Sequence, residues 1–62
     1  MNENKIEVYN QLEHIKTMSG SAAASYYRLA MRENTWEKRV KFINLTIEAL
    51  RAMIDELEGM AK

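Results

Sequence analysis

The sequence has no cysteine, no proline, two glycines and one histidine in 62 residues. Without cysteine the chain forms no disulfide and no thiolate metal site. A lone histidine leaves too few ligands for a structural zinc site, so we expect neither a metal nor another cofactor. The absence of cysteine is typical of proteins from a reducing cytosol, and we therefore expect a cytoplasmic location.

The sequence also lacks an excess of charge of either sign, and it lacks long apolar runs. Nine Lys and Arg residues balance nine Asp and Glu residues, so no overall field attracts nucleic acid or a membrane, and there is no DNA-binding signature. No stretch approaches the roughly 20 apolar residues of a membrane span. The first residues are polar and lack the apolar core of a signal peptide. We expect a small, soluble, intracellular protein of one domain, residues 1–62.

Strand signals are absent as well, and the chain is predicted to be all-α. Apolar residues recur at alternating spacings of four and three through the C-terminal half, which is typical of a helix that packs lengthwise against another helix. This ladder consists of Trp36, Val40, Ile43, Ile47, Leu50, Ile54 and Leu57. A second stripe on roughly the opposite side consists of Phe42, Leu45, Ala49 and Ala52. A helix that is apolar on two sides has to be covered on both, which predicts self-association.

The bounds of this helix are predicted from capping residues. We expect it to run from about residue 35 to 58, with Asn34 or Thr35 as the N-cap. With Asn34 as the cap, Glu37 would complete a capping box. Gly59 is the expected stop signal.

The N-terminal half has the same spacing and predicts a helix over about residues 4–33. The stripe consists of Val8, Leu12, Ile15, Ser19, Ala22, Tyr26 and Leu29. Ser19, Gly20 and Ser21 interrupt it, because glycine and serine are unfavourable inside helices. Either the helix continues with a bend, which the retained phase favours, or it breaks there and gives three helices. Small residues over 19–25 allow a close approach, with Trp36, Phe42 and Leu45 as the side chains expected to cover them.

These patterns predict a helical hairpin that assembles into a homo-oligomeric bundle. The expected interface joins the ladder to Phe42 and Leu45, because a four-helix bundle of two hairpins covers both stripes. In shape this resembles the small RNA-binding plasmid copy-number protein Rop, which has nearly the same length, although the two share no motif.

The turn end of the hairpin is predicted to be basic and the end with both termini acidic. The basic residues are Arg28, Arg32, Lys38, Arg39 and Lys41, and Tyr26 and Tyr27 lie near them. Arginine and tyrosine together suit a nucleotide or RNA, or an acidic protein surface. A structural explanation competes, because cations are favoured at a helix C-terminus and Tyr26 lies on the apolar stripe.

Catalytic signatures are lacking. His14 has no carboxylate or second histidine beside it, and Ser19-Gly20-Ser21 lacks the lysine of a phosphate loop. We therefore expect a non-enzymatic protein-interaction module, such as a regulator, adaptor or inhibitor of a larger protein, of a kind common among phage and mobile elements. The alternatives are an oligomer that binds a nucleotide or RNA through its basic end, and a structural self-assembly unit.

Overall fold

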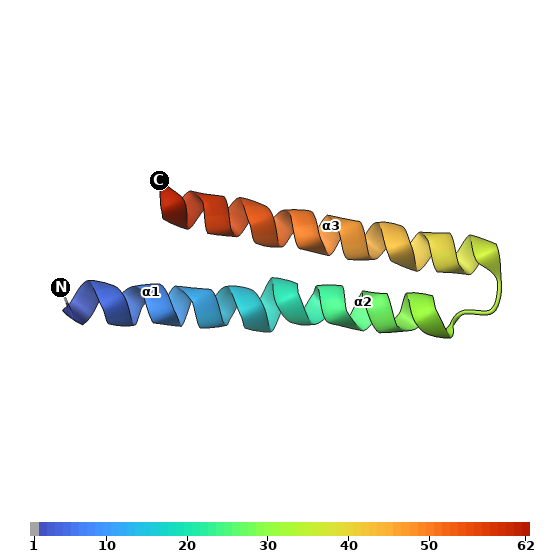
Figure 1. Cartoon of the computed structure of the whole chain (residues 1–62), viewed down its shortest axis with the longest axis horizontal. Helices are drawn as coiled ribbons and strands as arrows, with labels where there is room; N and C mark the ends of the chain where they lie inside the picture. The colour runs from blue at the N-terminus through green and yellow to red at the C-terminus, as the bar shows by residue number, and fades with distance from the viewer. Residues whose placement is uncertain (1) are drawn as a thin grey trace.

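The computed structural model of the protein describes residues 2–62, with side chains from Lys5 onward, and shows an antiparallel hairpin of helices (Figure 1). The first arm contains α1 (Asn2–Ile15), the π-helical turn η1 (Lys16–Gly20) and α2 (Ser21–Arg32). The second arm is α3 (Trp36–Ala61). Only residues 33–35 separate the two arms, and residues 2–62 contain no strand. The predicted all-α fold is confirmed.

The hairpin is long and only one layer thick. Its principal extents are 51 × 18 × 10 Å and its radius of gyration is 14.7 Å. A compact chain of this length would have a radius of gyration of about 10.6 Å. The first turns of α1 extend beyond the C-terminal end of α3 (Figure 1). Much of the surface of each arm therefore has no neighbour within the chain.

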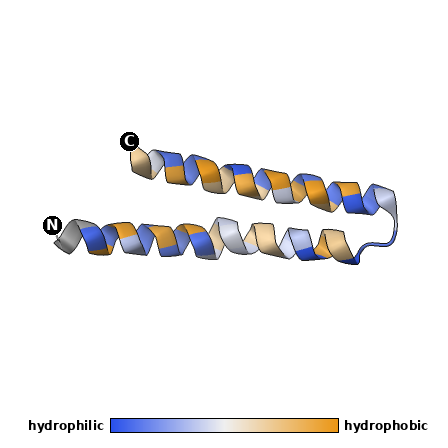
Figure 2. Ribbon diagram, in the orientation of Figure 1, coloured by the Kyte–Doolittle hydropathy of each residue, from blue (hydrophilic) through white to orange (hydrophobic). Residues whose placement is uncertain are grey.

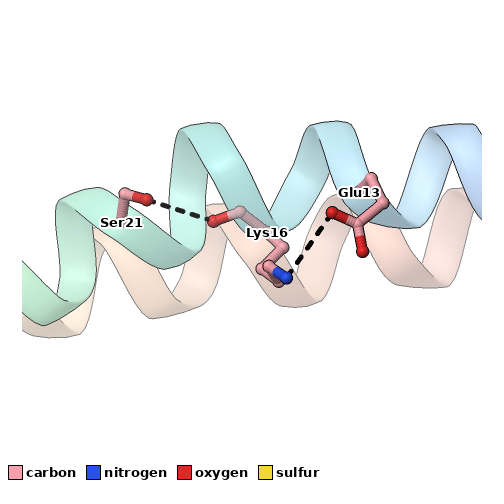
Figure 3. Close-up of polar contacts among 3 residues, drawn as sticks. All are labelled: Glu13, Lys16 and Ser21. Carbon is pink, nitrogen blue, oxygen red and sulfur yellow. Dashed lines mark hydrogen bonds and ion pairs between the residues drawn. The ribbon is translucent and has the colours of Figure 1, made fainter.

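The first arm stays helical through Ser19-Gly20-Ser21, by means of η1. The N–H of Ser21 donates to the carbonyl of Lys16, five residues back, which is the bond that defines a π turn. The hydroxyl of Ser21 donates to the same carbonyl at 3.5 Å, and Lys16 forms an exposed ion pair with Glu13 (Figure 3). Because the segment continues the helix and the N–H of Ser21 is already hydrogen-bonded, it is not a helix N-terminus open to an anion.

The π turn changes which residues face α3. It takes in one more residue than an α-helical turn, so the apolar stripe shifts by one position after it. Ala23 and Ala30 are buried, whereas Ala22 is half-buried and Leu29 is exposed. The predicted stripe through Ala22 and Leu29 is therefore displaced by one residue.

Both ends of α3 differ from the expected caps. Thr35 precedes the helix in an extended conformation, without a side-chain cap bond, and its carbonyl accepts from the N–H of Arg39 at 3.0 Å. Glu37 is then the second helical residue, one short of the position that a capping box needs. Gly59 does not end the helix: it lacks the positive φ of a glycine stop, and α3 continues to Ala61.

The interior of the hairpin is thin. Among the described side chains only Ile15, Ala23 and Ala30 are buried. On the α3 side, Phe42, Leu45, Ala49 and Met53 are half-buried. Two of the three buried residues are alanines, so the arms approach closely but remove little apolar surface from water.

Gly20→Ala should stabilise the hairpin by about 0.5–1 kcal/mol, because alanine loses less backbone entropy than glycine in a helix. An added Cβ would meet the Cε of Met53 at 3.8 Å, an ordinary van der Waals distance. Urea unfolding followed by circular dichroism measures the change. The matched control is Gly59→Ala, where no atom lies within 4 Å and fraying of the last turn should reduce the gain. A lower stability of Gly20→Ala would show that η1 requires glycine.

Candidate functional site

The structure divides the nine predicted interface residues into two sets. Phe42 and Leu45 are half-buried within the single chain, on the second stripe of α3. Most of the ladder is instead exposed, up to 69% for Trp36. The exposed members are Trp36, Ile43, Ile47, Leu50 and Ile54, whereas Val40 and Leu57 are half-buried. Trp36 therefore does not cover the small residues of the first arm; at Gly20 the nearest such side chain is Met53.

The exposed ladder borders an open apolar groove between α2 and α3. Near the turn the groove has a volume of about 480 Å³ and is lined by Tyr27 and Met31 of α2 and by Ile43 and Ile47 of α3. A second hollow of about 440 Å³ shares Tyr27 and Thr46 with the first and continues toward Gly20 and Leu50. We call the exposed apolar side chains on this side the ladder face: Tyr27, Met31, Trp36, Ile43, Ile47, Leu50 and Ile54.

Hydropathy follows the same pattern over the whole of α3. Figure 2 shows hydrophobic bands that recur along the helix between hydrophilic ones. Several exposed apolar side chains on one side of a hairpin are characteristic of a site that binds another macromolecule.

Three residues that line the groove near the turn are absent from the sequence-based set, namely Ala30, Met31 and Thr46. Met31 lies one turn after Tyr27, and Thr46 lies three residues after Ile43, so helical spacing alone would have placed both on this side. The hydroxyl of Thr46 donates to the carbonyl of Phe42 at 2.7 Å, which satisfies the hydroxyl within α3.

The predicted basic and aromatic residues do not form one cluster. Arg28 and Arg32 each lie two positions from the buried Ala30 and are exposed, which places both on the outer side of α2. Lys38 and Lys41 are exposed on α3. Tyr26 is half-buried, whereas Tyr27 lines the groove together with Arg39.

Arg39 has a structural contact at the turn. Its Nη2 donates to the carbonyl of Glu33 at 2.7 Å, and the N–H of Glu33 donates to the carbonyl of Leu29 at 3.1 Å. The Nε of Arg39 is buried without a hydrogen-bond partner. Arg39 thus ties α3 to the end of α2, and an anionic ligand would have to compete with that bond.

A third hollow, of about 390 Å³, lies near the chain ends between α1 and α3. Its lining includes His14, Ile15, Glu56 and Met60, and the hydroxyl of Ser19 donates to Oε1 of Glu56. Within residues 2–62 no three His, Asp or Glu side chains are grouped as a metal site would require. None of the helices described is both long and apolar enough to cross a membrane.

Comparison with known proteins adds no relative. No protein-family model matches the chain, and no curated protein and no solved structure matches it. The function of the chain is therefore inferred from the geometry of the hairpin alone.

Arg39→Ala should lower the stability of the hairpin by about 1 kcal/mol, because it removes the bond to the Glu33 carbonyl and the packing of the arginine stem. The matched control is Lys38→Ala, at the neighbouring exposed position, which should change stability by less than about 0.5 kcal/mol. Urea unfolding midpoints measure both. Equal effects of the two substitutions would contradict the structural role of Arg39.

Proposed function

We propose that this chain is a non-enzymatic, cytoplasmic protein-interaction module that acts as a regulator, adaptor or inhibitor of a larger protein. The single observation that carries the proposal is the ladder face, whose seven apolar side chains are exposed on one side of the hairpin. Exposed apolar residues that occur singly are ordinary, but several on one side of a hairpin favour a protein partner.

The chemistry of the groove supports a binding role rather than catalysis. Its lining near the turn is apolar apart from Thr46, Arg39 and the tyrosine hydroxyl. The Thr46 hydroxyl is bonded to a carbonyl of its own helix, and the Arg39 head is bonded to Glu33. General acid–base catalysis uses titratable groups in contrasting environments, and this lining contains no carboxylate or imidazole.

Binding of a nucleotide or RNA is the second candidate. It is favoured by the position of Tyr27 beside Arg39 in one groove, since a base stacks on an aromatic ring while a guanidinium holds a phosphate. The outward position of Arg28 and Arg32 weakens it, because these residues would not reach the same ligand.

Native mass spectrometry of the protein, purified without denaturation from the cells that produce it, tests the proposal. We expect bound polypeptide and no small ligand. A copurifying partner should be lost on Met31→Asp, which puts a charge on the ladder face, and retained on Leu29→Asp, which puts one on the other side of α2. An added mass of one nucleotide per 7.3 kDa chain, lost at high salt, would support the second candidate instead. A chain that carries no partner at all would contradict the proposed role.

A further inference from the structure

We propose that the ladder face is covered by a second copy of this chain, packed antiparallel about a two-fold axis to give a four-helix bundle. This inference rests on the proposed function, because it identifies a second copy of the chain as a partner that binds the ladder face. It is carried by the exposed area of the single chain and by the distribution of charge along the hairpin.

The exposed area is larger than that of a folded monomer of this size. The chain exposes 5324 Å², whereas a globular protein of 7.3 kDa exposes about 4,200 Å². The excess of about 1,100 Å² is comparable to the roughly 800 Å² that each partner buries in a standard interface. One further hairpin therefore supplies about the amount of burial that the chain lacks.

The ladder is suited to pack against a copy of itself. A two-fold interface brings the same patch of both subunits together, so the patch must be self-complementary. The spacing of Ile43, Ile47, Leu50 and Ile54 is that of helices that interlock side chain by side chain. The open groove beside these residues is mostly apolar, and its polar groups at Thr46 and Arg39 are already hydrogen-bonded within the chain, so the face can be buried without isolating many polar groups.

The charge distribution selects the antiparallel orientation. Arg28, Arg32 and Lys38 lie at the turn end, and Asp55, Glu56 and Glu58 lie toward the opposite end of α3. An antiparallel pair places each basic end beside an acidic end. A parallel pair would place like charges together, which is unfavourable at short range.

The ladder side of the hairpin continues onto α1. Gln11, His14 and Glu56 line the hollow near the chain ends, and Glu56 lies two positions from Ile54, so this hollow is on the side of the hairpin opposite the ladder face. Helix periodicity then puts Tyr9 and Leu12, both exposed, on the ladder side of α1. A second copy that covers the ladder face can therefore also cover these two side chains.

Sedimentation equilibrium and thermal unfolding over a range of concentrations form the first test. We expect a mass of twice 7.3 kDa, a Tm that rises with concentration, and a blue shift of Trp36 emission on association. Ile47→Asp should weaken association at least 100-fold, whereas Leu29→Asp should leave it unchanged. The two residues are matched, because each is 39% exposed in the single chain, but they lie on different sides of the hairpin.

A monomer whose Tm is independent of concentration would overturn the proposal, as would growth into open assemblies. If Ile47→Asp fails to fold, the dependence of the mass and Tm on concentration in the unmodified chain still shows whether the chain forms a dimer. A monomer that nevertheless retains a partner sensitive to Met31→Asp would refute the second copy and leave the proposed function standing. A dimer that carries no other protein would support the second copy and contradict the proposed function.

The orientation is tested by spin-label distances, for which the absence of cysteine is an advantage. Labels at Asn34→Cys, in the turn, should lie about 39 Å apart in an antiparallel dimer, the length of the 26 residues of α3. Labels at Arg51→Cys, near the middle of α3, should be close together in either orientation and serve as the control. A separation below about 20 Å at Asn34→Cys, as for adjacent helix ends, would establish a parallel dimer and overturn the proposal.

Discussion

The need to cover α3 on two sides governs the rest of this structure. A long helix with apolar side chains on two faces is stable in water only when both faces are shielded. The first arm of the chain shields one face, where Phe42 and Leu45 are half-buried. The other face borders an open groove, and residues 2–62 contain no further helix that covers it. The proposed assembly would supply the missing cover.

The close approach of the arms sharpens this constraint. Ala23 and Ala30 let α2 lie near α3, which gives good contact but removes little apolar area from water, since the hydrophobic contribution scales with the area buried. A 62-residue chain has little stability to spare even with a full core. A thin hairpin of this kind would therefore gain stability from any partner that covers the ladder face.

Much of the architecture was predictable from the sequence, and the exceptions have physical reasons. The alternating spacing of four and three predicted the helical arms and the two apolar sides of α3, because that periodicity follows from helix geometry. Which side packs within the chain was not predictable, since both stripes have the same period. Arg39 was read as a candidate ligand contact, whereas its bond to the Glu33 carbonyl depends on the path of the turn. Gly59 was expected to end α3, but a glycine stop needs a positive φ, and glycine inside a helix costs only about 1 kcal/mol relative to alanine.

The π turn has a consequence for how the sequence of this protein tolerates change in length. One additional residue is absorbed in Lys16–Gly20 while the helix continues on both sides. Removal of a single residue there would restore an ordinary α-helix with seven steps instead of eight between Ile15 and Ala23, and seven steps make almost two full turns. The two buried residues would therefore stay on the same side of the arm. Natural variants of this chain should accordingly accept the loss of one residue within the π turn more readily than within α1 or α2, where a deletion rotates the flanking residues by about 100°.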